Sequence, residues 1–151
     1  MKKLKQTVGI DVAQNELVCT FGYLLEDLSI GLKSSMTFKN SLTDFKKLKK
    51  WADKLTDDKK PFFVLEATGV YHQKLAHWLY DNAYQIVIVL PNKISNYCKT
   101  LKIKTVTDKT ASQAITRFGL ERKLERWMPS KPIFRKMKQL TRERDQIIAE
   151  R

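Results

Sequence analysis

Apolar and polar residues alternate in the first part of the chain, in the pattern of half-buried strands. In the segment Thr7–Val12, apolar side chains occupy every second position from Val8 onward, as they do when one face of a strand packs on a core. The segments Glu16–Leu25 and Ser29–Phe38 also have strand-like patterns and follow after short connections. Because short connections favour antiparallel pairing, we expect these three strands to form an antiparallel meander.

After Ser41, a candidate helix N-cap, the apolar period changes from two residues to three or four, which is typical of an amphipathic helix. Short apolar runs and helical patterns then alternate, with polar or proline-containing breaks between them. The expected elements are a helix at Leu42–Leu55, a strand at Phe62–Glu66, a helix at Val70–Asn82, a strand at Gln85–Leu90, an irregular basic segment at Asn92–Thr107, a helix at Lys109–Arg126 and a last helix at Ile133–Arg151.

This order of elements predicts an α/β fold. Three strands come first, and the following strand–helix–strand–helix–strand unit implies parallel pairing with crossover helices. The result is a mixed sheet with flanking helices, in the element order of the ribonuclease H-like fold. Pro129 and Pro132 mark a break, so we expect one domain at residues 1–128 and a projecting basic helix at residues 129–151.

Composition excludes several other classes of protein. Apolar residues make up 42% and charged residues 30% of the 151 positions, which is typical of a folded domain rather than a disordered one. The longest uncharged apolar run, Ile86–Pro91, is too short to cross a bilayer. The N-terminal residues are not followed by the apolar stretch of a secretory signal, and Cys19 and Cys98 form no CxxC pair. We therefore expect a cytoplasmic protein with reduced thiols, without a membrane partner.

The charge of the chain is strongly positive and uneven. Residues 1–90 contain 13 basic and 10 acidic groups, whereas residues 91–151 contain 16 basic and 6 acidic groups. An excess of this size predicts a polyanionic partner, above all nucleic acid. Single-strand binders combine basic grooves with aromatic side chains, so the candidate nucleic-acid contacts are Lys93, Tyr97, Lys99, Lys102, Lys104 and Lys109.

Two carboxylates stand in apolar surroundings. Asp11 lies between Ile10 and Val12 in the first strand, and Glu66 ends the apolar run that begins at Phe62. A carboxylate next to a core is costly unless hydrogen bonds or a cation compensate for its charge. Backbone donors would suffice for either residue alone, but two such residues on adjacent strands favour a site for Mg²⁺, which prefers hard oxygen ligands.

A third carboxylate, Asp108, opens the helix that follows the basic segment. A capping role would explain an aspartate at this position. However, the helix follows the last strand of the sheet, so Asp108 is also placed to reach the sheet edge that carries the other two carboxylates.

Three sequence blocks, beginning at Gly9, Leu65 and Lys104, resemble the DEDD-type insertion-sequence transposases. The blocks are Gly-Ile-Asp-Val-Ala, Leu-Glu-Ala-Thr-Gly-Val-Tyr and Lys-Thr-Val-Thr-Asp-Lys. These transposases are related to the Piv invertase and have a RuvC-like N-terminal domain. The second block is the most specific, and the likeness extends over nearly the whole chain, including the segment that begins at Gln139.

The resemblance implies a Mg²⁺- or Mn²⁺-dependent DNA recombinase domain that serves transposon strand cleavage and exchange. The first, second and third acids of the family match Asp11, Glu66 and Asp108, which are the catalytic and metal-binding residues that we expect. The fourth acid lies three residues after the third in the family, and here that position is Ala111. Ser112 follows, and we include it among the expected metal ligands as a weaker oxygen donor.

The family also implies partners. Its members have a C-terminal domain with a nucleophilic serine, joined through a coiled coil, and this chain is expected to stop before that domain and to be inactive alone. Some members use a structured guide RNA. A heptad seam runs from Ile133 through Met137 and Leu140, but Arg144 and Arg151 interrupt it. We therefore expect only a weak homodimer through this helix.

Three other functions compete with this interpretation. A stand-alone nuclease of the Holliday-junction type would have the same fold and the same carboxylates. A non-catalytic nucleic-acid-binding module would explain Ala111 in place of the fourth acid. Half of an actin-like ATPase would share the block at Gly9, but the chain lacks glycine-rich phosphate loops.

Overall fold

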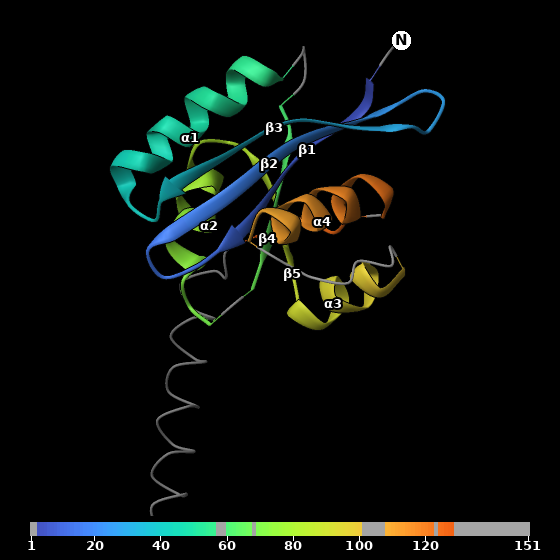
Figure 1. Ribbon diagram of the computed structural model, residues 1–151. Helices are drawn as coiled ribbons and strands as arrows, with labels where there is room; N and C mark the ends of the chain where they lie inside the picture. Colours follow the sequence, from blue (N-terminus) through green and yellow to red (C-terminus); the bar gives the residue numbers. More distant parts are fainter. Residues whose placement is uncertain (1–2, 57–59, 68, 101–107, 123, 129–151) are drawn as a thin grey trace, which may run out of the picture.

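A five-stranded sheet forms the centre of the molecule (Figure 1). The structure is a computed structural model, and it describes residues 3–56, 60–67, 69–100, 108–122 and 124–128, without the side chains of residues 108–110. In spatial order the strands are β3 (Ile30–Lys39), β2 (Glu16–Leu25), β1 (Lys3–Val12), β4 (Phe62–Glu66) and β5 (Gln85–Val89).

The sheet is antiparallel on one side of β1 and parallel on the other. The first three strands pair in antiparallel order as a meander. On the other side, β4 pairs in parallel with β1, in a register that runs from Thr7 beside Phe62 to Ile10 beside Leu65. The strand β5 pairs in parallel with β4. The predicted mixed sheet is therefore confirmed.

Helices cover both faces of the sheet. In Figure 1, α1 and α2 lie on one side of it, and α4 and α3 lie on the other. The parallel strands require crossover connections, and α2 provides the crossover between β4 and β5. Within the described residues, the helices are α1 (Leu42–Leu55), α2 (Gln73–Asp81), α3 (Pro91–Thr100) and α4 (Asp108–Glu121).

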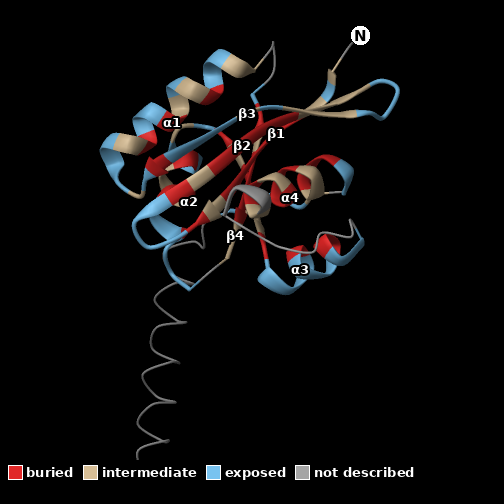
Figure 2. Cartoon of the chain, viewed as in Figure 1, coloured by how far each residue is buried: buried red, intermediate tan, exposed pale blue. Residues whose placement is uncertain are grey.

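The alternation in β1 divides its side chains between two cores. Val8, Ile10 and Val12 belong to the larger core beneath α1 and α2. The positions between them face α4, where Gly9 N–H donates a 3.0 Å hydrogen bond to Thr116 Oγ1. Buried residues follow the central strands and the inner sides of the helices (Figure 2). Both cysteines, Cys19 and Cys98, are buried free thiols.

One predicted segment is wrong and several boundaries move. We expected an irregular stretch at Asn92–Thr107, but residues Pro91–Thr100 form α3, with Ile94, Tyr97 and Cys98 buried on one face. Pro91 occupies the first turn of this helix, where a missing N–H costs nothing. The helix α2 starts at Gln73 rather than Val70. The predicted helix Ile133–Arg151 lies outside the described residues.

Candidate metal and nucleic-acid site

Asp11 and Glu66 are brought together by the parallel register of β1 and β4. Ile10 pairs with Leu65, so the next position along each strand is Asp11 and Glu66. Paired positions of neighbouring strands are about 4.8 Å apart and point to the same face of the sheet. The two carboxylates are therefore neighbours at the carboxyl ends of the strands, on the face that α4 covers.

The electrostatics of Glu66 agree with this placement. Partial burial, followed by the negative charge of Asp11, raises the pKa of Glu66 above its usual value. Glu66 in turn lies close enough to the Cys98 thiol that its charge contributes, after burial, to raising the pKa of Cys98. A pair of like charges in a half-buried place is unfavourable, and a bound cation would relieve it.

The helix α4 brings Asp108 to the same edge of the sheet. Lys5 Nζ, near the start of β1, donates to the carbonyl of Arg122 at 3.1 Å, whereas Thr116 contacts Gly9. The helix therefore runs antiparallel to β1, and its first residue, Asp108, lies at the end of β1 that carries Asp11. Ser112, Ile115 and Gly119 share one side of the helix by spacing, and all three are buried.

Gly9 allows α4 to lie directly against the sheet. A Cβ atom at Gly9 would stand 2.3 Å from Thr116 Oγ1 and 2.8 Å from the carbonyl oxygen of Ser112. The Thr116 hydroxyl also donates to the carbonyl of Thr20 at 2.9 Å. Sequence reasoning missed this contact, although an isolated glycine inside a strand signals a close approach of backbone.

Ser112 takes part in the same contact. It is fully buried, and its hydroxyl shares a 2.7 Å hydrogen bond with Thr20 Oγ1 on β2. This bond engages the hydroxyl in packing α4 on the sheet. A metal-ligand role for Ser112 stays a prediction, and this placement does not favour it.

Tyr97 does not form the base-stacking surface that we expected. Its side chain is only 3% exposed, its hydroxyl donates to Glu121 Oε2 at 2.7 Å, and its ring packs edge-on against Phe118. Burial, followed by the hydrogen bond to Glu121, raises the pKa of Tyr97. Tyr97 fastens α3 to α4, so the stacking prediction is wrong for this arrangement.

The other predicted nucleic-acid contacts are only partly described. Lys93 and Lys99 are exposed on α3. Lys102 and Lys104 lie outside the described residues, and Lys109 belongs to α4 without a described side chain. The contact prediction stays open for these five lysines. Among the residues that the structure describes, no group of three His, Cys, Asp or Glu side chains is arranged to hold a metal ion.

Asn40 links the loops that follow the carboxylate-bearing strands, and no sequence pattern indicated this role. Its Nδ2 donates 3.0 Å hydrogen bonds to the carbonyls of both Ala13 and Tyr71. Ala13 follows β1 two residues after Asp11, and Tyr71 lies in the turn between Glu66 and α2. The backbone N–H of Asn40 also donates to the carbonyl of Asn15 at 3.0 Å. Asn40 therefore ties together the loops that follow the two carboxylate-bearing strands.

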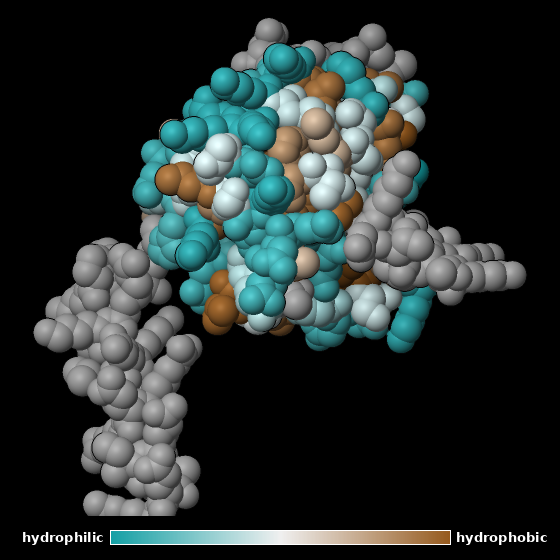
Figure 3. Space-filling view, turned by 60° about the vertical axis from the view of Figure 1, so that its left-hand side comes forward, coloured by the Kyte–Doolittle hydropathy of each residue, from teal (hydrophilic) through white to brown (hydrophobic). Residues whose placement is uncertain are grey.

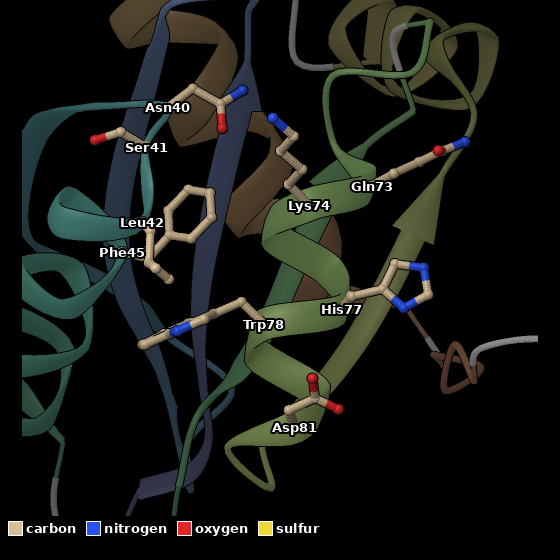
Figure 4. Close-up of a pocket in the computed structure, with 9 residues that line it drawn as sticks. All are labelled: Asn40, Ser41, Leu42, Phe45, Gln73, Lys74, His77, Trp78 and Asp81. Atoms are coloured by element: carbon tan, nitrogen blue, oxygen red, sulfur yellow. The ribbon is translucent and has the colours of Figure 1, made fainter.

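A groove of about 710 Å³ lies between α1 and α2, on the other face of the sheet. Figure 4 shows the rings of Phe45 and Trp78 facing the space between the two helices, with Asn40 and Lys74 at its upper end. The groove shares Asn40 with the loops that follow the carboxylate-bearing strands. It is separate from the pair formed by Asp11 and Glu66.

We expect the variant Glu66→Gln to stabilise the protein at neutral pH when no metal is present. The folded-state pKa of Glu66 is raised, so the folded protein holds this proton more tightly than the unfolded chain. That stabilising effect is complete below the unfolded pKa of about 4.3 and is lost as the pH rises through the folded pKa. The melting temperature of Glu66→Gln should therefore exceed that of the wild type at neutral pH and approach it in acid.

Thermal melts in EDTA across this pH range measure the difference. Glu16→Gln, which changes an exposed carboxylate at the start of β2, is the control and should show no comparable gain. A lower melting temperature for Glu66→Gln than for the wild type at neutral pH would contradict the proposed repulsion.

A mixed five-stranded sheet with two adjacent carboxylates at the carboxyl ends of its central strands is typical of ribonuclease H-like proteins. The solved structure of Thermus thermophilus RuvC matches 81% of this chain and 99% of its own, with a TM-score of 0.57 at 10% identity. The fowlpox virus Holliday junction resolvase matches 73% of this chain with a TM-score of 0.51 at 9% identity. These likenesses establish a RuvC-like ribonuclease H-like fold.

Sequence comparisons identify the family. A family model described as the DEDD transposase of the IS110 type matches residues 8–151. The pilin gene-inverting proteins of Moraxella bovis and Moraxella lacunata are each 30% identical over 152 residues, which is 97% of this chain. The chain belongs to the DEDD transposase family of the IS110 type. It spans 45% of the length of these Moraxella relatives.

Among the described residues, no helix is long and apolar enough to cross a membrane.

Proposed function

We propose that this chain is the metal-binding and DNA-binding part of a transposase, in which Asp11, Glu66 and Asp108 hold Mg²⁺ or Mn²⁺ for cleavage and exchange of transposon DNA strands. The observation that carries the proposal is the register that places Asp11 beside Glu66 at the edge where α4 begins. Membership of the DEDD transposase family supports the reaction class.

The donor set fits a hard divalent cation. Carboxylate oxygens are the ligands that Mg²⁺ and Mn²⁺ prefer, and a few of them suffice because Mg²⁺ retains several waters. The raised pKa of Glu66 reflects, after burial, its repulsion by Asp11, which a cation would reverse. When bound, such a metal supplies stabilisation of the attacking and leaving oxygens of a phosphodiester.

The residues of the chain have separate roles in holding the carboxylates and in binding the phosphate backbone. Asp11 and Glu66 are held side by side because they occupy neighbouring positions of paired strands, and Asn40 ties the following loops together. Lys93 and Lys99 place positive charge on α3, where they would hold the phosphate backbone of the bound strand. As further partners we propose a structured guide RNA and a second copy of the chain, paired weakly through residues 129–151.

Mn²⁺ should raise the melting temperature of the wild-type protein and leave that of Asp11→Asn unchanged. A ligand that binds only the folded state stabilises it by about 2.7 kcal/mol at a hundredfold excess over Kd. Thermal melts with a Mn²⁺ series measure the shift. Asp81→Asn, an exposed aspartate at the end of α2, is the matched control and should respond as the wild type does. Equal shifts in the wild type and Asp11→Asn would refute the site.

A further inference from the structure

The outer side of α1 carries a row of lysines. The inner side of this helix is formed by Phe45, Leu48 and Ala52, which are buried. Lys46, Lys50 and Lys54 are exposed and recur every fourth residue, about 6 Å apart along the helix axis. We call these three residues the α1 lysine stripe. Figure 3, which turns the α1 side of the molecule forward, shows hydrophilic residues over much of this surface.

The acidic residues of α1 do not neutralise the stripe. Asp44 accepts a 2.6 Å hydrogen bond from the backbone N–H of Lys39 and lies 3.7 Å from Lys47 Nζ. Asp53 accepts hydrogen bonds from the Tyr84 hydroxyl at 2.7 Å and from Lys49 Nζ at 3.1 Å.

Lys46 and Lys50 therefore keep their charges available. Within the described part of the chain, neither of them makes an ion pair. Like charges at this spacing on a helix are destabilising, by about 0.2–0.5 kcal/mol per pair. A row of lysines that weakens its own helix fits a surface that meets a polyanion.

The stripe starts at the edge of the sheet that carries the carboxylates. The helix α1 begins at Leu42, directly after Ser41. Asn40, which precedes Ser41, donates to Ala13 and Tyr71 in the loops beside Asp11 and Glu66. From Lys46 the stripe then extends about 12 Å along the helix. A nucleic acid held at the carboxylate edge would meet Lys46 first as it passed onto this side of the molecule.

We propose that the α1 lysine stripe contacts the phosphate backbone of duplex DNA that extends past the carboxylate edge, on the opposite side of the sheet from the basic helix α3. The inference rests on the proposed function, because that function supplies DNA as the partner. The stripe presents ammonium groups without aromatic side chains between them, so it contacts phosphates without reading sequence. In this arrangement the DNA contacts lysines on both sides of the sheet, those of α3 and those of the α1 lysine stripe.

The test compares two pairs of substitutions that remove the same charge. Lys46→Gln with Lys50→Gln changes the stripe. Lys3→Gln with Lys33→Gln is the control, because neither residue lies on α1 or at the carboxylate edge. Lys3 opens β1 at the end remote from Asp11, and Lys33 is the fourth of the ten residues of β3. Binding of a random-sequence DNA duplex is measured by fluorescence anisotropy over a salt series, in EDTA. The stripe pair should make the negative slope of log affinity against log salt less steep by about 1.8, at about 0.9 for each lost phosphate contact.

A charge-retaining variant and a comparison with duplex RNA make the test more specific. Lys46→Arg with Lys50→Arg retains both charges and should keep the wild-type slope. Equal effects of the stripe pair and the control pair would overturn the proposal, since net charge alone would then explain them. Weakened binding of duplex RNA with unchanged binding of duplex DNA would also overturn it. Because the assay contains no divalent metal, failure of the stripe and failure of the Asp11 metal site are separate outcomes.

Discussion

Replacing Gly9 with alanine should destabilise the fold by about 3 kcal/mol, the upper end of the usual cost of overpacking. The new Cβ would stand 2.4 Å from the backbone nitrogen of Thr116 and 2.3 Å from its Oγ1. Backbone cannot move aside as a side chain can, so α4 must shift away from β1 and lose the hydrogen bond from Gly9 N–H. Urea denaturation monitored by circular dichroism measures the loss.

Gly31→Ala is the matched control for this prediction. A Cβ at Gly31 would also meet atoms at short distance, the nearest 2.3 Å away, but they belong to the outer end of the Tyr23 ring. Tyr23 is only half-buried, so its side chain can rotate away. We expect a clearly smaller loss for Gly31→Ala, and similar losses for the two variants would show that the contact between α4 and β1 is not the reason for Gly9.

The edge of the sheet that carries the two carboxylates could be predicted from the sequence. It depends on the alternation of apolar residues and on the parallel pairing of strands that a helix connects. Alternation identified the strand that carries Asp11, and the strand–helix–strand order required Phe62–Glu66 to pair in parallel. Parallel strands end at the same edge, so the two acids were expected at that edge, on strands that can lie side by side. The actual register, with Ile10 beside Leu65, set which side chains became neighbours and was not available from the pattern.

Most of the errors arose where contacts between distant segments of the chain determine the structure. Tyr97 lies among lysines in the sequence, but Phe118 and Glu121 on α4 cover its ring and bind its hydroxyl. The helix α3 was missed because Pro91 was interpreted as the end of a strand, whereas it also begins a helix well. Thr20 and Ser112 are 92 residues apart, and no local signal connects them. The role of Asn40 depends in the same way on two loops from elsewhere in the chain.

Restoring the missing acid should strengthen metal binding. Ala111 is half-buried on α4, three residues after Asp108 and four before the fully buried Ile115. Ile115 packs in the cluster that contains Val64 of β4. Because α4 runs antiparallel to β1, which is paired in parallel with β4, Ala111 lies one helical turn closer than Ile115 to the strand end that carries Glu66. An aspartate here adds a carboxylate to the site, and Ala111→Asp should lower the Kd for Mn²⁺ on the order of tenfold, since ligand charge tunes affinity.

The same substitution should destabilise the metal-free protein, because a further negative charge joins Asp11 and Glu66. Melting temperatures in EDTA and in a Mn²⁺ series should therefore move in opposite directions relative to the wild type. Gln113→Asp adds the same charge two residues later on α4, on another side of the helix, and is the control for general electrostatic attraction of Mn²⁺. If both variants bind Mn²⁺ equally well, position 111 does not face the metal, and the departure from the family pattern has no bearing on the site.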